Sequence, residues 1–486
     1  MNEDIRELEP KGIWKNFCDL NAVPRPSKKE EQVIAFMKNF GESLNLETIE
    51  DEVGNVIIRK PATAGMESRK KVVLQSHLDM VHQKNNDTDF DFATQGIEMM
   101  IDGDWVTAKG TTLGADNGLG VATIMAILES DSIPHPAIEA LFTIDEETGM
   151  TGAMGLKSGI LQGDVLLNLD TEEDDEIGVG CAGGIDVTAS KSYETQEISE
   201  DHLGYTVSVK GLQGGHSGMD IIKGLGNANK LMNRLLLEAH LVGEMHLVKL
   251  NGGGLRNAIP RESNAVIAVA KSNQEQFLDV MESLAAEILE EYSALEPNLE
   301  VEFDITETPK QGLTTESQEA LLKALQAAHN GVYRMSPDIE GLVETSNNVA
   351  KVTVENGAID ILCLSRSSSD SSKNDIVRSL ESVFELAGFS VELSGEYPGW
   401  QPNMQSSILK VMENNYRSLF NEEPHVAACH AGLECGILGQ NYPEMEMISF
   451  GPTIRGAHSP DEKASISSVK KFWKLTLATL KDFPEA

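Results

Sequence analysis

The sequence predicts an α/β protein, with a mixed sheet flanked by helices and a smaller α+β domain inserted into it. Three observations support this fold class. Short β-branched runs alternate with helical segments near both ends of the chain. The pattern changes near residue 187 and returns near residue 400. Between these points the elements follow a β-α-β-β-α-β order, which is the split βαβ arrangement.

The first part of the chain alternates helix and strand. Ser27 and Glu30 have capping-box spacing and predict a helix to about residue 44. The mostly apolar segment 118–129 contains small residues and predicts a buried helix. Because apolar runs of strand length alternate with these helices, we expect a sheet covered on both faces. These runs are 56–58, 72–74, 138–144 and 165–169.

The middle of the chain repeats one order of elements. The first copy has helices at 227–240 and 274–292, with strands at 205–209, 246–250, 264–270 and 299–305. The second has helices at 316–329 and 372–387, with strands near 341–345, 349–355, 358–364 and 389–394. We therefore expect a lid domain at 187–399 built from two similar halves, about 187–310 and 311–399.

The last part of the chain resembles the first. A helix at 405–420, a strand at 445–450 and an amphipathic helix at 467–482 are predicted there. The simplest architecture joins residues 1–186 and 400–486 in one catalytic domain.

Composition excludes several classes of partner. A formal net charge of −38 over 486 residues repels nucleic acid and anionic membrane surfaces. The five cysteines form no CxxC pair, so neither a disulfide framework nor a thiolate zinc site is indicated. The polar N-terminus resembles no leader sequence, and no apolar run approaches the roughly 18 residues that span a bilayer. We expect a cytoplasmic protein without nucleic-acid or membrane partners.

Histidines and acidic residues follow the predicted strands or lie in glycine-rich turns. Such positions lie at the carboxyl ends of strands, where α/β sheets present functional side chains. Imidazole and carboxylate ligands without thiolates suit zinc, cobalt or manganese in hydrolysis. The five expected ligands are His77, Asp116, Glu147, Asp170 and His458.

A two-metal site gives each ligand a role. One carboxylate must bridge ions that lie about 3.5–4 Å apart, and Asp116 is the short acid in a glycine-rich loop. His77 with Asp170 would complete one ion, and Glu147 with His458 the other. We expect two Zn²⁺, with Co²⁺ or Mn²⁺ as substitutes. A hydroxide between them would attack the carbonyl, because a metal lowers the pKa of water from 15.7 to about 7.

Two further acidic residues receive supporting roles. Adjacent side chains diverge, so Glu147 can bind metal while Glu146 acts as general base and later as general acid. Asp79 lies two residues after His77 and would orient its imidazole through the far ring nitrogen. A single His-x-Asp or Glu-Glu pair would favour a surface interpretation, and the acidic run 172–176 is assigned to a charged loop. The metal set stands because five segments agree in ligand type and position.

The segments HLD, GADNG, EE, NLD and GAHSPDE resemble the zinc peptidase and deacylase family that includes aminoacylase and glutamate carboxypeptidases. The resemblance extends over nearly the whole chain, with GGHSG and RNAIP in the inserted domain. The segments KPATAGME, KNNDT, GTTLGADNG, GCAGGID, PGWQP and HAGLECG are similar to a bacterial group within it that cleaves Xaa-His dipeptides, carnosine among them. The resemblance implies a homodimeric zinc enzyme.

Further site residues follow from this resemblance alone. His216 would polarise the scissile carbonyl, with Asn257 sharing in that role or in substrate positioning. Arg366 would clamp the substrate carboxylate, and the backbone near Gly432 would meet the amino end of the substrate. His82 stands where close relatives commonly have proline, and it is not assigned as a ligand.

Three functions remain open at this point. The first is a dizinc dipeptidase, the second a related deacylase acting on N-acyl amino acids, and the third a non-catalytic metal-binding relative. Rates on β-Ala-His and on an N-acetyl amino acid separate the first two. The presence of all five ligands disfavours the third.

Overall fold

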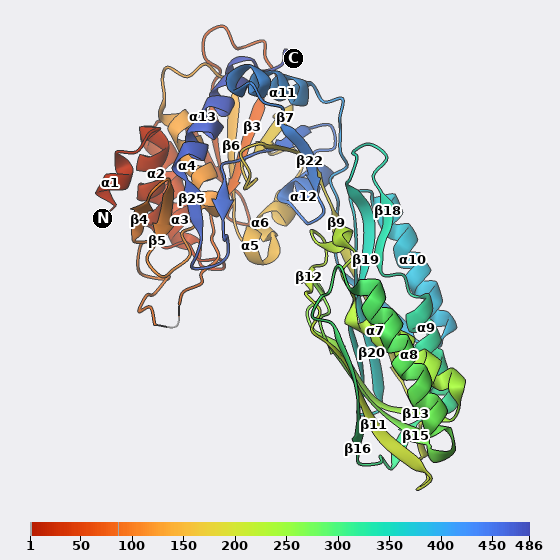
Figure 1. Cartoon of the computed structure of the whole chain (residues 1–486). Helices are drawn as coiled ribbons and strands as arrows, with labels where there is room; N and C mark the ends of the chain where they lie inside the picture. Colours follow the sequence, from red (N-terminus) through yellow and green to blue (C-terminus); the bar gives the residue numbers. More distant parts are fainter. Residues whose placement is uncertain (1, 86) are drawn as a thin grey trace. The chain divides into compact units, whose positions relative to one another are not determined.

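The computed structural model describes residues 2–85 and 87–486, and they form two compact units (Figure 1). The first unit comprises the chain as far as Gly180, followed by Trp400–Ala428 and Leu433–Ala486. The second unit comprises Cys181–Gly399 and Cys429–Gly432.

A mixed sheet forms the centre of the first unit. Strand β3 pairs in parallel with β6 and β7, β7 pairs in parallel with β23, and the pairs β1·β2, β2·β6 and β23·β8 are antiparallel. In order across the sheet, the strands are β1 (Glu47–Glu50), β2 (Val56–Lys60), β6 (Ile138–Thr143), β3 (Val72–His77), β7 (Val165–Asn168), β23 (Glu446–Ser449), β8 (Glu176–Cys181) and β22 (His425–Cys429).

Both faces of this sheet are covered. Every residue of β3, β6 and β7 is buried, which requires cover above and below because strand side chains alternate between faces. Val73, Leu141 and Leu166 pack with residues of α6 and α12, and α4 contacts β3 and α2. The helices of this unit are α1 (Glu3–Arg6), α2 (Lys11–Asn21), α3 (Glu31–Ser43), α4 (Ala115–Glu129), α5 (Glu146–Gly149), α6 (Thr151–Gly155), α11 (Ser407–Phe420), α12 (Glu434–Asn441) and α13 (Ile466–Lys481).

A small antiparallel sheet also belongs to the first unit. Its order is β24 (Ile454–Arg455), β25 (Lys463–Ser465), β5 (Trp105–Ala108) and β4 (Met99–Asp102). It joins the last part of the chain to the segment before α4, and the turn between β24 and β25 carries His458.

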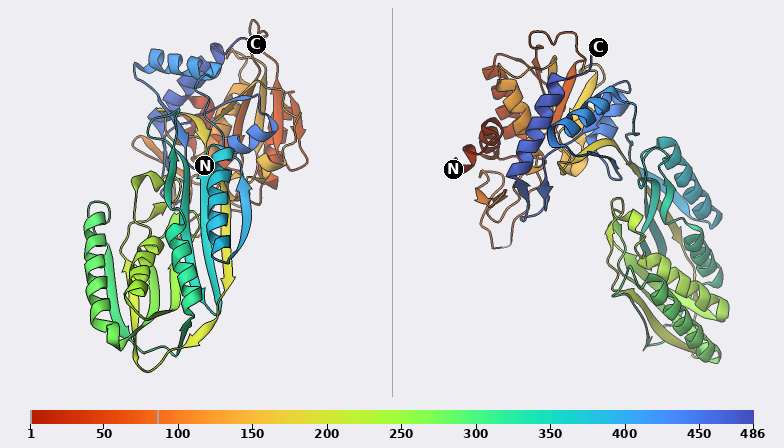
Figure 2. Two further views of the ribbon diagram at one scale, coloured as in Figure 1. Left: turned by 90° about the vertical axis from the view of Figure 1, so that its right-hand side faces the viewer. Right: turned by 45° about the horizontal axis from the view of Figure 1, so that its top comes forward.

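The second unit is one long antiparallel sheet with helices along one face (Figures 1 and 2). The strand order is β16 (Glu300–Thr306), β11 (His202–Lys210), β15 (Ser263–Ala270), β13 (Met245–Gly253), β19 (Val343–Glu355), β20 (Ala358–Ser367), β9 (Gly183–Ser192) and β21 (Ser390–Tyr397), and β18 (Gly331–Met335) pairs with β19. The helices are α7 (Ala228–Val242), α8 (Gln274–Tyr292), α9 (Thr315–Ala327) and α10 (Asp370–Leu386). Short pieces are β10 (Thr195–Glu197), β17 (Gln311–Leu313), β12 (Gly215–His216), β14 (Ala258–Ile259) and the 3₁₀ turns 221–223 and 271–273.

This sheet contains two split βαβ arrangements side by side. The order β16-β11-β15-β13 uses α7 and α8, and the order β21-β9-β20-β19 uses α9 and α10. The second copy differs from the contiguous segment 311–399 expected from the sequence. Its first strand is β9, which precedes the first copy in the chain and pairs with β20 and β21. The first copy is thus inserted into the second.

Two local predictions were wrong. Ser27 and Glu30 form no capping box: α3 begins after Glu30, and the Ser27 hydroxyl donates to Asp79 Oδ2 at 2.7 Å. The strands expected near 341–345 and 349–355 are one continuous strand, β19. Its polar segment stays extended because the pairing with β20 runs through it, with a register shift between Val349 and Lys351.

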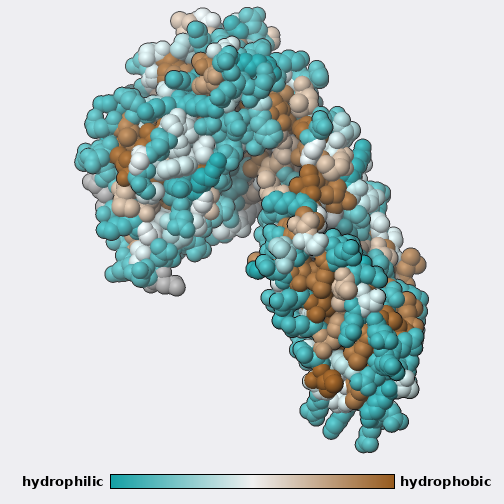
Figure 3. Space-filling view, in the orientation of Figure 1, coloured by the Kyte–Doolittle hydropathy of each residue, from teal (hydrophilic) through white to brown (hydrophobic). Residues whose placement is uncertain are grey.

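The surface is mainly hydrophilic on the face shown in Figure 3, and hydrophobic residues gather in patches along the second unit. Exposed large apolar side chains of that unit include Leu241, Ile305 and Leu386. No helix in the described part of the chain has the length and apolarity needed to cross a membrane.

Candidate metal centre

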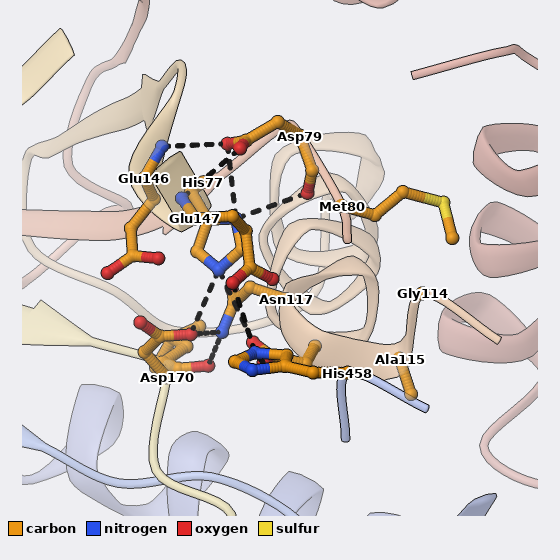
Figure 4. Close-up of polar contacts among 12 residues, drawn as sticks. His77, Asp79, Met80, Gly114, Ala115, Asn117, Glu146, Glu147, Asp170 and His458 are labelled. Atoms are coloured by element: carbon orange, nitrogen blue, oxygen red, sulfur yellow. Dashed lines mark hydrogen bonds and ion pairs between the residues drawn. The ribbon is translucent and has the colours of Figure 1, made fainter. Parts of the chain in front are cut away.

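Three neighbouring parallel strands of the first unit end at the same edge of the sheet. His77 is the last residue of β3, Glu146 and Glu147 follow β6, and Asp170 follows β7. Asp145 turns the chain after β6 with φ 55°, in the left-handed region that aspartate tolerates. Because the carboxyl ends of adjacent parallel strands meet, four side chains from distant segments converge (Figure 4).

Asp116 lies at the centre of this cluster, near the N-terminus of α4. Its Oδ1 is 3.3 Å from His77 Nε2, and its Oδ2 is 3.1 Å from His458 Nε2. His77 Nε2 is also 3.4 Å from Asp170 Oδ1, and His458 Nε2 is 3.0 Å from Glu147 Oε2. The five residues therefore form two trios that share Asp116, and in each the ligand atoms lie within 4.8 Å of one another.

The electrostatics of this cluster fit bound cations. Burial raises the pKa of Glu147 and of Asp170, and the charge of Asp116 adds to both shifts. Hydrogen bonding to Asp116 and Glu147 raises the pKa of His458 to about 11. Glu147 Oε1 is buried and has no hydrogen-bond partner among the described residues. Crowded carboxylates with an unsatisfied oxygen are a donor set that divalent ions neutralise and complete.

Asp79 connects the imidazole of His77 to the Glu146–Glu147 turn. Its Oδ1 lies 3.4 Å from His77 Nδ1 and accepts from the Glu146 amide at 3.0 Å, and its Oδ2 accepts from the Glu147 amide at 3.3 Å. Burial raises its pKa, but His77, Ser27 and the Glu146 amide outweigh burial and lower it to about 2. Asp79 thus holds two ligand-bearing segments in fixed positions (Figure 4).

Glu146 is half-buried beside this turn. Burial raises its pKa well above the usual value, against the opposing charge of His77. Its own side chain belongs to neither of the trios that share Asp116, although one oxygen falls within 4.8 Å of ligand atoms of His77 and Glu147.

The loop of Asp116 is held by two buried residues that the sequence analysis did not single out. The Glu462 carboxylate accepts four backbone amides, from Leu113 (2.7 Å), Gly114 (2.9 Å), Ala115 (2.8 Å) and Asp116 (3.2 Å). Arg25 donates to the Leu78 carbonyl at 3.1 Å and the Asp79 carbonyl at 3.2 Å, and to Gly114 O at 2.5 Å. A methyl group at Gly114, whose φ is 70°, would lie 2.5 Å from the guanidinium. Glu462 lies in the quoted HSPDE segment, whereas no pattern surrounds Arg25.

Glu434 is a third buried residue to which the sequence analysis assigned no role of its own. It begins α12, is fully buried, and its Oε2 accepts from Gln75 at 2.6 Å and from Thr143 at 2.7 Å. Its Oε1 has no hydrogen-bond partner in the described part of the chain. Burial raises the pKa of Glu434 to about 7. A half-satisfied buried carboxylate near Glu146 is a natural acceptor for a ligand amine.

The remaining expected site residues lie in the second unit. His216 Nδ1 accepts from the Gly218 amide at 3.2 Å and the Met219 amide at 3.0 Å, so its neutral ring carries the proton on Nε2. Burial and then the charge of Arg366 lower the pKa of His216, which keeps that ring neutral. Arg366 is 5% exposed and donates to the Tyr397 hydroxyl at 2.7 Å, and its buried Nε lacks a partner among residues the structure describes.

His430 interacts with His216 and Arg366, and the sequence analysis assigned it no role. Its Nε2 lies 2.8 Å from the Ser346 hydroxyl, and burial together with Arg366 lowers its pKa to about 3. Gly432 lies close to Tyr397, because a Cβ atom added at Gly432 would be 3.0 Å from the tyrosine ring. Asn257 is exposed, and its carbonyl accepts from the Ser217 amide at 2.8 Å.

His82 lies outside these clusters. It is exposed, stacks edge-on against Phe92 with ring centroids 5.9 Å apart, and belongs to none of the possible metal groups found among the described residues.

Comparison with known proteins places this arrangement in a family. The model of peptidase family M20/M25/M40 matches residues 73–482. A cytosol non-specific dipeptidase of Escherichia coli (strain K12) is 45% identical over 485 residues, which cover 99% of each chain. The crystal structure of an aminoacylhistidine dipeptidase from Vibrio alginolyticus is 44% identical and matches all of both chains with a TM-score of 0.95. An aminopeptidase PepT from Bacillus cereus, at 15% identity, covers 98% of each chain with a TM-score of 0.57 and shares the fold. The chain belongs to peptidase family M20/M25/M40.

Proposed function

We propose that this protein is a dipeptidase that uses two divalent metal ions. The observation that carries the proposal is the position of Asp116, whose two carboxylate oxygens face different histidines. His77 with Asp170 would hold one ion, Glu147 with His458 the other, and Asp116 both. The relatives named as dipeptidases support the reaction class.

The donor set favours zinc. Two imidazoles and three carboxylates without thiolate suit two Zn²⁺, and Co²⁺ or Mn²⁺ would accept the same ligands. Bound there, the ions would lower the pKa of an attacking water and polarise the scissile carbonyl.

Glu146 is the proposed proton carrier. Its backbone amide is fixed by Asp79, and its carboxylate lies next to the ligand Glu147 without belonging to either trio that shares Asp116. It would remove a proton from the attacking water and deliver a proton to the departing amine. Asp79 would act through His77 and the Glu146–Glu147 turn as a positioning residue.

Residues of the second unit would act on the same substrate. His216 carries its proton on Nε2 and would donate it in a hydrogen bond to the scissile carbonyl oxygen. Arg366 would bind the substrate carboxylate through two parallel hydrogen bonds. Its Nε has no hydrogen-bond partner among the described residues and can therefore donate one of them. Asn257 would help to position the substrate, and the backbone at Gly432 would meet its amino end.

Glu434 favours a substrate with a free amino group. A protonated amine would satisfy its unpaired Oε1 and compensate its buried charge, whereas an N-acyl group would not. This observation favours a dipeptidase over an N-acyl amino acid deacylase. The names of the two relatives differ in specificity, and we propose Xaa-His dipeptides such as carnosine as the preferred class. We also propose a cytosolic location, as the name of the Escherichia coli relative states for that protein, and a homodimer.

A dipeptide panel tests this function. The full chain loaded with Zn²⁺ is assayed on β-Ala-His, on other Xaa-His dipeptides, on Leu-Gly and on an N-acetyl amino acid. We expect dipeptide cleavage, with the highest kcat/KM on Xaa-His. Faster cleavage of the N-acetyl amino acid would instead support the deacylase, and no cleavage of any substrate by protein with both ions bound would support a non-catalytic relative.

A further inference from the structure

Two buried histidines and a glutamate gather at one end of the sheet of the second unit. His202 begins β11, and Glu244 and His246 lie at the start of β13. Strand β15 runs between these two strands (Figure 1), with His202 opposite Ala270 and His246 opposite Ala268. Because strand residues alternate between faces, Ala268 and Ala270 lie on one face, and the two histidines share it.

This face is the one opposite the helices. Tyr205, Val207 and Val209 alternate with His202 along β11 and belong to the helix-covered core. The residues of β15 between the two imidazoles are alanines, so the rings approach each other, with centroids 5.2 Å apart. His202 and His246 are each only 5% exposed.

The Glu244 carboxylate lies at nearly equal distances from both rings. Its Oε1 is 3.6 Å from His202 Nε2 and 3.5 Å from His246 Nε2. Both distances exceed the roughly 2.7–3.2 Å of a hydrogen bond. They approach the edge of a tetrahedron around zinc, about 3.3 Å for ligand bonds of roughly 2.0–2.1 Å. All three ligand atoms lie within 4.8 Å of one another.

The far ring nitrogens are held by other polar groups. His202 Nδ1 lies 3.0 Å from the Ser199 hydroxyl, and His246 Nδ1 lies 2.8 Å from the side-chain amide of Gln196. A proton on Nδ1 that donates to Ser199 leaves a lone pair on His202 Nε2. In His246 the Gln196 amide nitrogen faces Nδ1, so the same tautomer requires the Gln196 side-chain amide to turn and present its oxygen to the ring. His202 Nε2 is buried and has no hydrogen-bond partner within the described ranges. This is the tautomer of a metal-binding histidine.

Burial favours the neutral imidazole of His246. Burial and then the neighbouring His202 lower the pKa of His246, against the opposing effect of Glu244. A neutral ring is the ligand form, and an anionic carboxylate beside it supplies charge for a cation.

We propose that His202, Glu244 and His246 form a further cation site, which binds one Zn²⁺ or a similar divalent transition-metal ion with water completing its coordination. The site is separate from the centre around Asp116 and does not depend on the dipeptidase function. The ion would tie the turn between α7 and β13 to the start of β11 across β15.

Zinc binding to the full chain tests the proposal. Protein freed of metal by a chelator is titrated with Zn²⁺ in equilibrium dialysis, and bound metal is counted per chain. We expect His202→Asn to bind one equivalent fewer than the unmodified chain. His240→Asn is the matched control, because His240 lies in α7 of the same unit and belongs to no metal group among the described residues.

Glu244→Gln is a second variant that tests the site without disturbing the fold, because the Glu244 side chain is 62% exposed. We expect this variant to weaken the binding of one equivalent at least tenfold and to leave dipeptide cleavage unchanged. Equal stoichiometry and affinity in Glu244→Gln and the unmodified chain would overturn the proposal.

Discussion

The proposed metal centre of the first unit and the histidine cluster of the second differ in how their proposed ligands are fixed. Around Asp116 the ligand-bearing segments are held by further hydrogen bonds, from Glu462 to the loop and from Asp79 to the Glu146–Glu147 turn. In the second unit the imidazoles are fixed at Nδ1, but Glu244 is largely exposed. The ends of the parallel strands β3, β6 and β7 bring together ligands from several segments. The end of the antiparallel sheet brings together ligands from only two segments, at the start of β11 and at the start of β13. We therefore expect tighter metal binding in the first unit.

The largest expected effect is a loss of kcat without a loss of bound metal in the first unit. Glu146→Gln removes the proposed proton carrier but leaves all five ligands, so kcat should fall by about 10²–10⁴-fold. Metal content measured after dialysis should match that of the unmodified chain. Near-normal kcat with both ions bound would show that another group carries the proton, and Glu173→Gln, on a charged surface loop, is the control.

A second variant is expected to weaken metal binding at the site around Asp116 alone. Glu462→Gln weakens the acceptor of four amides that position Asp116, and we expect metal affinity of the first unit to fall about 10–100-fold. Zn²⁺ binding by the histidine cluster of the second unit should not change. Asp461→Asn changes the neighbouring acid and serves as control. Equal loss at both sites would mean that the variant disturbs the whole fold.

A third variant concerns substrate binding beside the first centre. Glu434→Gln removes the charge proposed to bind the substrate amine, and we expect KM for β-Ala-His to rise about tenfold, equivalent to about 1.4 kcal/mol. Because Glu434 is not a proposed ligand, metal content should remain two ions. An unchanged KM would exclude this carboxylate from amine recognition, and Glu444→Gln at an exposed position is the control.

The smallest effect concerns the framework of the first unit. Burial raises the pKa of Glu446, but Lys70, Ser406 and Ser407 outweigh burial and lower it to about 2, from 4.5. A lowered folded-state pKa means that this stabilisation is complete above pH 4.5 and is lost as the pH falls towards 2. Glu446→Gln should therefore reduce the free energy of unfolding by about 1–2 kcal/mol at pH 7.

Urea unfolding at a series of pH values measures this effect. The difference between Glu446→Gln and the unmodified chain should shrink below pH 4.5 and vanish near pH 2. A constant difference across that range would assign the effect to packing instead of charge.

Sequence reasoning reached the fold class and the buried sheet because apolar runs such as Val72–Leu74 specify strands locally. It predicted His77, Glu147 and Asp170 as ligands because they end or follow such strands, and these side chains lie within 4.8 Å of Asp116 or His458 in the structure. It did not find Arg25, because the role of this residue depends on the approach of the chain at Leu78 and Gly114, far away in sequence. It missed β9 as the first strand of the second copy, since its partner β20 begins at Ala358.

The order of segments in the first unit has a consequence for protein synthesis. Strand β23 lies between β7 and β8, and both His458 and Glu462 follow it in the chain. The residues made first therefore wait as an incomplete sheet, while the second unit, made almost entirely of one continuous stretch, emerges from the ribosome and folds. A nascent chain would gain its hydrolytic capacity in one step, only after the segment that carries His458 and Glu462 has been made.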